Sequence, residues 1–168
     1  MALQLIEIAD ITVASPVTSV DFTSIPSGYT DLLLKISARS SDGNVDDGAN
    51  IYFNNNTTAG NYSFRRLRGT GTSVVSDSSS ASSRWLQVCG NTATTNTLGN
   101  MEIYIPNYTS SSNKSASVDM VSETYASAVG CGVVAGLWNQ TAAITSISIA
   151  SGGNFFLTNT TATLYGVL

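Results

Sequence analysis

The chain of 168 residues contains no histidine. This absence removes the usual base of Ser-His-Asp and Cys-His catalysis, and it removes the commonest nitrogen ligand of zinc. The two cysteines cannot complete a tetrahedral zinc site by themselves. Neither of the common glycine-rich phosphate-binding motifs occurs. The sequence therefore predicts a protein that is not an enzyme and that carries no cofactor.

Charged side chains are scarce, at 11% of the residues, where about a quarter is usual. Ser, Thr, Asn and Gly take their place, which is common on β surfaces that pack into assemblies. The net charge of −4 argues against a nucleic-acid partner, because neutralising phosphates requires clustered Lys and Arg. The 42% of hydrophobic residues indicates a globular fold with a core of its own.

Long apolar runs are also missing, since no stretch approaches the roughly 18 residues of a membrane helix. The first stretch, MALQLIEIADITVA, alternates and carries Glu7 and Asp10, which predicts a strand rather than a secretory signal. We therefore expect no membrane partner and synthesis in a cytoplasm. There, Cys89 and Cys131 are expected to be two buried thiols. A disulfide would require their strands to be neighbours, which the sequence leaves open.

Alternation of apolar and polar residues dominates the chain, and no stretch keeps a helical period over about 11 residues. Turn residues separate about ten short segments of this kind, which predicts an all-β fold. Without a linker or a break in composition, we expect one antiparallel β-sandwich domain over residues 1–168, jelly-roll-like. The predicted strands cover residues 3–14, 17–22, 31–39, 50–54, 62–68, 84–89, 101–105, 115–121, 128–138, 143–149 and 162–168.

The strands at 101–105 and 115–121 flank a polar loop and predict a β-hairpin. Glu102 could lie across from Asp119, which an exposed polar face explains without catalysis. The alternate positions, expected to enter the core, are Ile103, Ile105, Val118 and Met120. The serine-rich segment 73–84 is interpreted as a mobile surface loop. Its alternative is a segment that becomes ordered only against a neighbouring subunit.

The loop SDGNVDDGAN holds the densest group of acidic residues. Asp42, Asn44 and Asp46 have the spacing of the first three ligands of a calcium loop. The match then fails, because Asp47 replaces the glycine at the sixth position and Phe53 replaces the glutamate at the twelfth. A solvated turn is the favoured interpretation, and a calcium site is the weaker alternative.

The segment FRRLR is the one basic cluster, with Arg65, Arg66 and Arg68. On a strand, Arg66 and Arg68 share a face and Arg65 points the other way. The cluster is either a solvated edge that resists aggregation or a docking patch for an acidic partner surface. The three arginines, with Tyr108 and Lys114, are the candidate interface residues.

Six aromatic residues leave two interpretations open, either a core or interface cluster or a platform for stacking sugars. The core or interface is favoured. The residues are Tyr52, Tyr62, Tyr104, Tyr108, Trp85 and Trp138.

Three stretches resemble a family of known proteins. They are GLWNQTAAITSISIASGGNFFLTNTTATLYGVL near the C-terminus, IPSGYTDLLLKISARS in the first half, and IYIPNYTSSSNKS between them. A Trp before TAAITSI, an NF pair after a glycine turn, and a final LYG plus an aliphatic residue are similar to the ending of β-rich virion proteins of tailed bacteriophages. The resemblance covers most of the chain from about residue 25.

This resemblance implies a structural protein and carries over no catalytic residues. It favours a capsid decoration or cement protein that binds the major capsid protein or other virion proteins and stabilises the shell. The protein would lie in the virion, on the capsid surface rather than the tail, as a homo-oligomer and more specifically a trimer. The alternative is a tail or fibre component with a receptor- or carbohydrate-binding sandwich.

Overall fold

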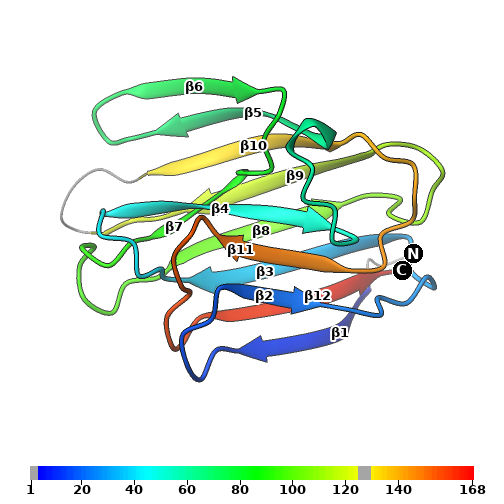
Figure 1. The fold of residues 1–168 in the computed structure, drawn as a ribbon, viewed down its shortest axis with the longest axis horizontal. Coiled ribbons are helices and arrows are strands. Elements are labelled where there is room, and N and C mark those ends of the chain that lie inside the picture. Colours follow the sequence, from blue (N-terminus) through cyan, green and yellow to red (C-terminus); the bar gives the residue numbers. More distant parts are fainter. Residues whose placement is uncertain (1–3, 125–129) are drawn as a thin grey trace.

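The computed structural model describes residues 4–124 and 130–168, which form two antiparallel β-sheets packed as a sandwich (Figure 1). The strands are β1 (Leu5–Thr12), β2 (Ser19–Phe22), β3 (Asp31–Ala38), β4 (Asp46–Phe53), β5 (Tyr62–Gly69), β6 (Val74–Ser79), β7 (Leu86–Cys89), β8 (Gly99–Ile105), β9 (Lys114–Val121), β10 (Cys131–Trp138), β11 (Ile147–Ser151) and β12 (Thr161–Val167). A 3-10 turn (Ala59–Asn61) precedes β5. The predicted all-β sandwich is confirmed.

The two sheets differ in size. The large sheet has the order β1-β12-β3-β8-β9-β10-β5-β6, and the small sheet has the order β2-β11-β4-β7. The chain crosses between the sheets at each step from β1 to β5, at each step from β6 to β8, and at each step from β10 to β12. This alternation is compatible with a jelly roll. Strands β9, β10, β5 and β6 then extend the large sheet beyond β8 (Figure 1).

Each predicted strand overlaps an observed one, but β6 was not predicted. It lies inside the serine-rich segment 73–84, so the interpretation of that whole segment as a mobile loop is wrong. β6 pairs with β5 through backbone hydrogen bonds, which need no apolar side chains, and serine hides the alternation on which strand prediction depends. Residue 3 and residues 128–129 of two predicted strands lie outside the described residues.

The predicted hairpin is confirmed by the pairing of β8 with β9. Ile103 lies opposite Val118, and both are buried. Glu102 lies opposite Asp119 on the exposed face, as expected. The alternation therefore assigned the two faces of this hairpin correctly.

Aromatic rings form the centre of the core between the sheets. Phe53 on β4 lies 5.5 Å from Trp138 on β10 and 6.0 Å from Trp85, measured between ring centroids. Tyr62 packs 6.0 Å from Trp85, and its hydroxyl donates to the Asn56 carbonyl at 2.8 Å. Burial raises the pKa of Tyr62 to about 12. Tyr62, Trp85 and Trp138 are buried, so they belong to the core and not to a sugar-stacking platform, whereas Tyr104 is 37% exposed and Tyr52 is partly buried.

The two cysteines lie in different sheets, Cys89 on β7 and Cys131 on β10, and both are free. Cys89 is buried beside the Ser122 hydroxyl at 3.2 Å. Cys131 is exposed, so the prediction of two buried thiols is wrong for this residue. Side chains of β10 point alternately inward and outward, and the side chain of Cys131 points outward.

Phe53→Ala should remove the central ring of the aromatic cluster and lower the free energy of unfolding by about 3–5 kcal/mol. Phe155→Ala is the matched control, because Phe155 is 48% exposed and should lose less than about 1 kcal/mol. Urea denaturation followed by tryptophan fluorescence measures both. Equal losses would contradict the central place of Phe53.

Candidate functional site

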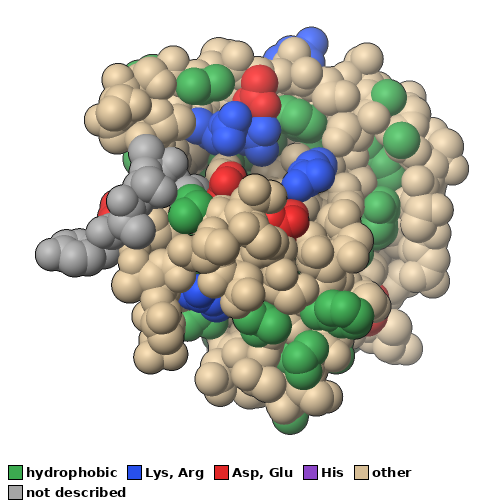
Figure 2. All heavy atoms as spheres, turned by 60° about the vertical axis from the view of Figure 1, so that its left-hand side comes forward, with side chains coloured by type: hydrophobic (Ala, Val, Ile, Leu, Met, Phe, Trp, Pro, Cys, Tyr) green, Lys and Arg blue, Asp and Glu red, His purple; other side chains and the backbone are tan. Residues whose placement is uncertain are grey.

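Charged and amide side chains gather at one end of the sandwich, where the acidic loop enters β4 and where Arg68 of β5 meets Gln87 of β7. Figure 2 shows Lys and Arg side chains next to Asp and Glu side chains on this face. We call this group the polar end. Its members are Asp42, Asn44, Asp46, Asp47, Arg66, Arg68, Asp77, Arg84, Gln87, Ser151 and Asn154.

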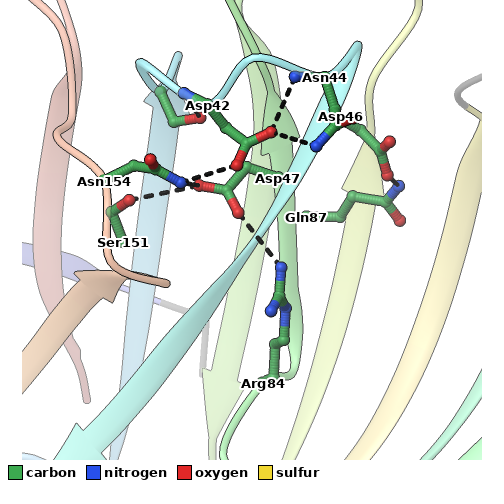
Figure 3. Close-up of polar contacts among 9 residues, drawn as sticks. Asp42, Asn44, Asp46, Asp47, Arg84, Gln87, Ser151 and Asn154 are labelled. Carbon is green, nitrogen blue, oxygen red and sulfur yellow. Dashed lines mark hydrogen bonds and ion pairs between the residues drawn. The ribbon is translucent and has the colours of Figure 1, made fainter.

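Asp42 organises the acidic loop (Figure 3). Its carboxylate accepts from the backbone N–H of Asn44 at 2.8 Å and from the Asn44 side chain at 2.6 Å. Asn154, in the loop after β11, donates to the other oxygen at 2.8 Å. The hydrogen bond from the Asn44 backbone, with help from the two amide side chains, holds the pKa of Asp42 below its usual value. These bonds join the loop to the turn after β11.

Asp47 is buried at the start of β4, with only 3% of its surface exposed. Arg84 donates to it at 3.2 Å, and the Ser151 hydroxyl donates at 3.3 Å (Figure 3). Gly48 makes the approach of the arginine feasible, because a Cβ there would lie 1.9 Å from the Arg84 Nε. The burial of Asp47 is therefore compensated by an arginine that crosses the strand at a glycine.

The acidic loop differs from the favoured interpretation as a solvated turn, and the weaker calcium alternative stays a prediction. The burial of Asp47 shows that it is not merely a solvated turn. Asp46 accepts from the Gln87 side chain, whereas Asp42 accepts from Asn44 and Asn154. Over residues 4–124 and 130–168, no group of three or more His, Cys, Asp or Glu side chains could hold a metal ion.

The arginines of β5 form the second half of the polar end. Arg66 donates to Asp77 on β6 at 2.9 and 2.5 Å, which is a bidentate pair. Arg68 lies 3.9 Å from the same carboxylate and donates to Gln87 on β7 at 3.4 Å. Gln87 in turn donates to Asp46. Polar contacts thus connect β6, β5, β7 and β4, and they bridge the two sheets.

The structure corrects the two interpretations of this basic cluster. Arg66 and Arg68 share a face, as expected, but both are only partly exposed and pair within the chain. The edge strand is β6 rather than β5. Of the three arginines only Arg65 is exposed, and it lies on the opposite face of β5. It therefore remains a candidate interface residue.

A small cavity of about 200 Å³ lies beside Arg68. Asp46, Gln87, Ser122 and Cys131 help to line it, and the buried Nε of Arg68 has no hydrogen-bond partner among the described residues. The cavity is polar and carries both signs of charge. Sequence reasoning missed Gln87, as it missed the other partners of the acidic loop, since amides and serines are too frequent in this chain to stand out.

Two candidate interface residues are buried, so those predictions are wrong. Lys114 is 1% exposed, and its ammonium donates to three loop carbonyls, of Ser110 at 2.7 Å, Ser112 at 2.6 Å and Thr141 at 3.3 Å. Burial lowers the pKa of Lys114. Tyr108 is fully buried, and its hydroxyl donates to a backbone carbonyl. A buried polar atom requires a hydrogen-bond partner. Backbone carbonyls are the partners of both residues, so both stabilise the loops that supply these carbonyls.

A second surface lies on the outer side of the large sheet. On β10, Val134 and Trp138 point inward and are buried, so Val133 and Leu137 point outward. Neighbouring strands add further exposed apolar side chains. We call this surface the outer apolar face, and its residues are Leu67 (49% exposed), Val74 (75%), Val121 (46%), Val133 (53%) and Leu137 (37%).

Comparison with family models, with curated proteins and with solved structures finds no match to this chain. The resemblance to phage virion proteins therefore stays a prediction from the sequence. The described part of the chain also contains no helix that is long and apolar enough to span a membrane.

Lys114→Met should lower the free energy of unfolding by about 2–4 kcal/mol, because three loop carbonyls lose their donor while the side-chain volume is kept. Lys35→Met is the matched control. Lys35 is half exposed and pairs with Glu102 at 3.3 Å, an exposed ion pair that contributes less than about 1 kcal/mol. Urea denaturation compares the two variants, and an equal loss would refute a special role for the buried ammonium.

Asp77→Asn should lower stability in a pH-dependent way. The hydrogen bond from Arg66 holds the pKa of Asp77 below its usual value. The stabilisation is therefore present above the unfolded-state pKa of about 4 and is lost as the pH falls through the native pKa. The difference in unfolding free energy between wild type and variant should shrink on acidification.

Urea denaturation at a series of pH values between about 7 and about 3 measures this difference. Asp21→Asn serves as the control, since Asp21 is exposed and accepts from the Ser19 hydroxyl at 2.6 Å. A difference for Asp77→Asn that stays constant over the whole range would show that its pairing with Arg66 does not depend on ionisation.

Proposed function

We propose that this protein is a structural component of a bacteriophage virion, most specifically a decoration or cement protein that binds the outside of the capsid. The major capsid protein would be its principal partner, and copies of the chain would associate with one another. The resemblance in the sequence motivates the proposal. The surface of the folded protein supports a role that depends on contact with other proteins.

The observation that carries the proposal is the outer apolar face. Exposed apolar side chains that stand singly are normal, whereas a contiguous group marks an interaction surface. Leu67 and Val133 are direct neighbours across β5 and β10, and Val74 on β6 lies opposite Gly69, two residues from Leu67 along β5. With Cys131 and Val121 on the next row of the sheet these residues form a compact apolar patch, whereas Leu137 stands apart between Ser63 and Ser115. The patch offers another subunit of the assembly, a capsid protein or a second copy of this chain, an apolar contact.

The polar end supports the same role, because its contacts make the fold more rigid. A shell component must keep its shape under load, and hydrogen bonds from Arg68 through Gln87 to Asp46 join the two sheets where the core ends. Arg66 and Arg84 each engage a carboxylate of this end. These charges are used within the chain, which leaves few of them for binding a charged substrate.

A specific observation favours the alternative, a tail or fibre component that binds a carbohydrate. A shallow groove of about 420 Å³ crosses the outer side of the large sheet beside the apolar face. Lys35, Asn100, Glu102, Asp119 and Thr163 are among the residues that line it. Such a mixture of hydrogen-bonding groups is suited to sugar hydroxyls.

The number of copies per purified particle tests the proposal, measured by quantitative mass spectrometry against the major capsid protein. A number comparable with that of the capsid protein is expected for a decoration protein, and particles that lack the protein should lose their DNA at a lower temperature. A few copies per particle would instead support the tail component, and a glycan array would then test the groove. Absence from particles would refute both.

A further inference from the structure

The geometry points to a two-fold symmetric dimer of this chain, in which the outer apolar faces of two copies pack against each other. This dimer goes beyond the proposed function and does not depend on it, because it assigns the outer apolar face to association between copies, so that attachment of the dimer to a capsid would use its other surfaces. The apolar face alone would suit many partners. Three further features indicate that the partner is a second copy of this chain. They are the placement of charge, the symmetry that this placement requires and the size of the surface.

The apolar face has one unpaired charge of each sign on its two flanks. β10 runs through the middle, with Arg65 on β5 at one side and Asp119 on β9 at the other. Arg65 is level with Ala135, and Asp119 is level with Val133, two residues or about 7 Å away along β10. The Arg65 guanidinium donates to the carbonyl of Phe64 at 3.0 Å. Within residues 4–124 and 130–168, neither charge takes part in an ion pair.

A positive charge near Asp119 would be stabilising. Asp119 lies directly opposite Glu102 on β8, and like charges in that position repel each other. Lys35 compensates Glu102 at 3.3 Å from the other side. Asp119 keeps its charge uncompensated beside apolar side chains. A cation supplied by another molecule would remove the repulsion.

Symmetry then decides how two copies meet. A two-fold axis parallel to β10 exchanges the two flanks, so that Arg65 of each copy approaches Asp119 of the other. A self-complementary contact of this kind is what a two-fold interface requires. An axis across the strands would instead place Arg65 on Arg65. The first arrangement also keeps the strands of the two copies nearly aligned, as in other packed sheets, at about −30°.

The surface is large enough for such a contact. The outer side of the sheet from β8 to β6 holds the apolar face together with its flanking polar residues. Its five strands, about 4.8 Å apart and about eight residues of 3.4 Å long, cover roughly 650 Å². Specific interfaces begin at about 600 Å² per partner. A shallow depression of about 290 Å³, lined by Leu67, Val74, Val133 and Asp119 among others, can receive a side chain of the other copy.

Charge reversal tests the dimer with the purified full-length chain. Arg65→Glu and Asp119→Arg each place like charges across the axis, so each should raise the dissociation constant of the dimer at least about tenfold. The two variants mixed together should associate, because every contact between them then joins opposite charges. The double variant in one chain should also recover. Multi-angle light scattering after size exclusion and analytical ultracentrifugation measure these changes.

Controls separate association from folding. Thr57→Glu adds a charge at an exposed position away from the apolar face and should leave the dimer unchanged. Circular dichroism and melting curves establish that each variant is folded. A monomeric or trimeric wild type, or single variants that associate as the wild type does, would overturn the proposal. So would a mixture that associates no better than its components.

The exposed Cys131 gives an independent readout. It lies at the end of β10, so the axis parallel to this strand places the two Cys131 thiols near each other. A short bismaleimide should therefore link two chains through two thioether bonds, and Cys131→Ser should abolish the link. Efficient association without any cross-link through Cys131 would overturn this axis. Because these tests need no virion, a failed dimer and a failed copy-number measurement are distinguishable.

Discussion

The structure depends on a mismatch between its two sheets, since four strands cover a sheet of eight (Figure 1). An apolar core forms only where the two sheets face each other. The inner face of β5 shows the boundary, because Tyr62 and Phe64 are buried whereas Arg66 and Arg68 on the same face are partly exposed. Where the covering sheet ends, arginine side chains replace apolar ones, and their long stems still cover the surface.

This boundary explains why the polar end is built from ion pairs and amides. An unpaired charge at the rim of a core is costly, so each of these groups needs a partner. Gln87 is suited to the junction because its amide accepts from Arg68 and donates to Asp46 at the same time. The two sheets are thus joined by apolar contact in the middle and by hydrogen bonds at this end.

The sequence was sufficient for the fold class and for most strands, because alternation along a strand is a local property. It identified the core side of β8 and β9 through residues such as Ile103 and Val118. It failed for β6, where serine on both faces conceals the pattern. It also failed for Lys114 and Tyr108, because a lysine or tyrosine next to a polar loop is usually exposed, and only the folded loop supplies their buried carbonyl partners.

The polar end was beyond sequence reasoning for a different reason. Asp47 and Asn154 are 107 positions apart in the chain, and no pattern in either stretch indicates that they meet. The calcium spacing of Asp42, Asn44 and Asp46 is a local property of the sequence, and it did not indicate that Asp42 accepts from Asn154 or that Asp46 accepts from Gln87. Local periodicity predicts which face a side chain occupies, whereas partners across sheets follow from the topology.

The position of β12 also has a consequence for how the chain acquires its structure. β12 lies between β1 and β3, and Asp10 pairs with Thr163 across 153 positions of sequence. The large sheet therefore cannot close until β12 has been synthesised, and until then β1 and β3 have no strand between them. Closing such long loops is slow. The earlier strands must remain unpaired at these edges during synthesis, and the low charge of the chain gives them little electrostatic protection against joining other chains.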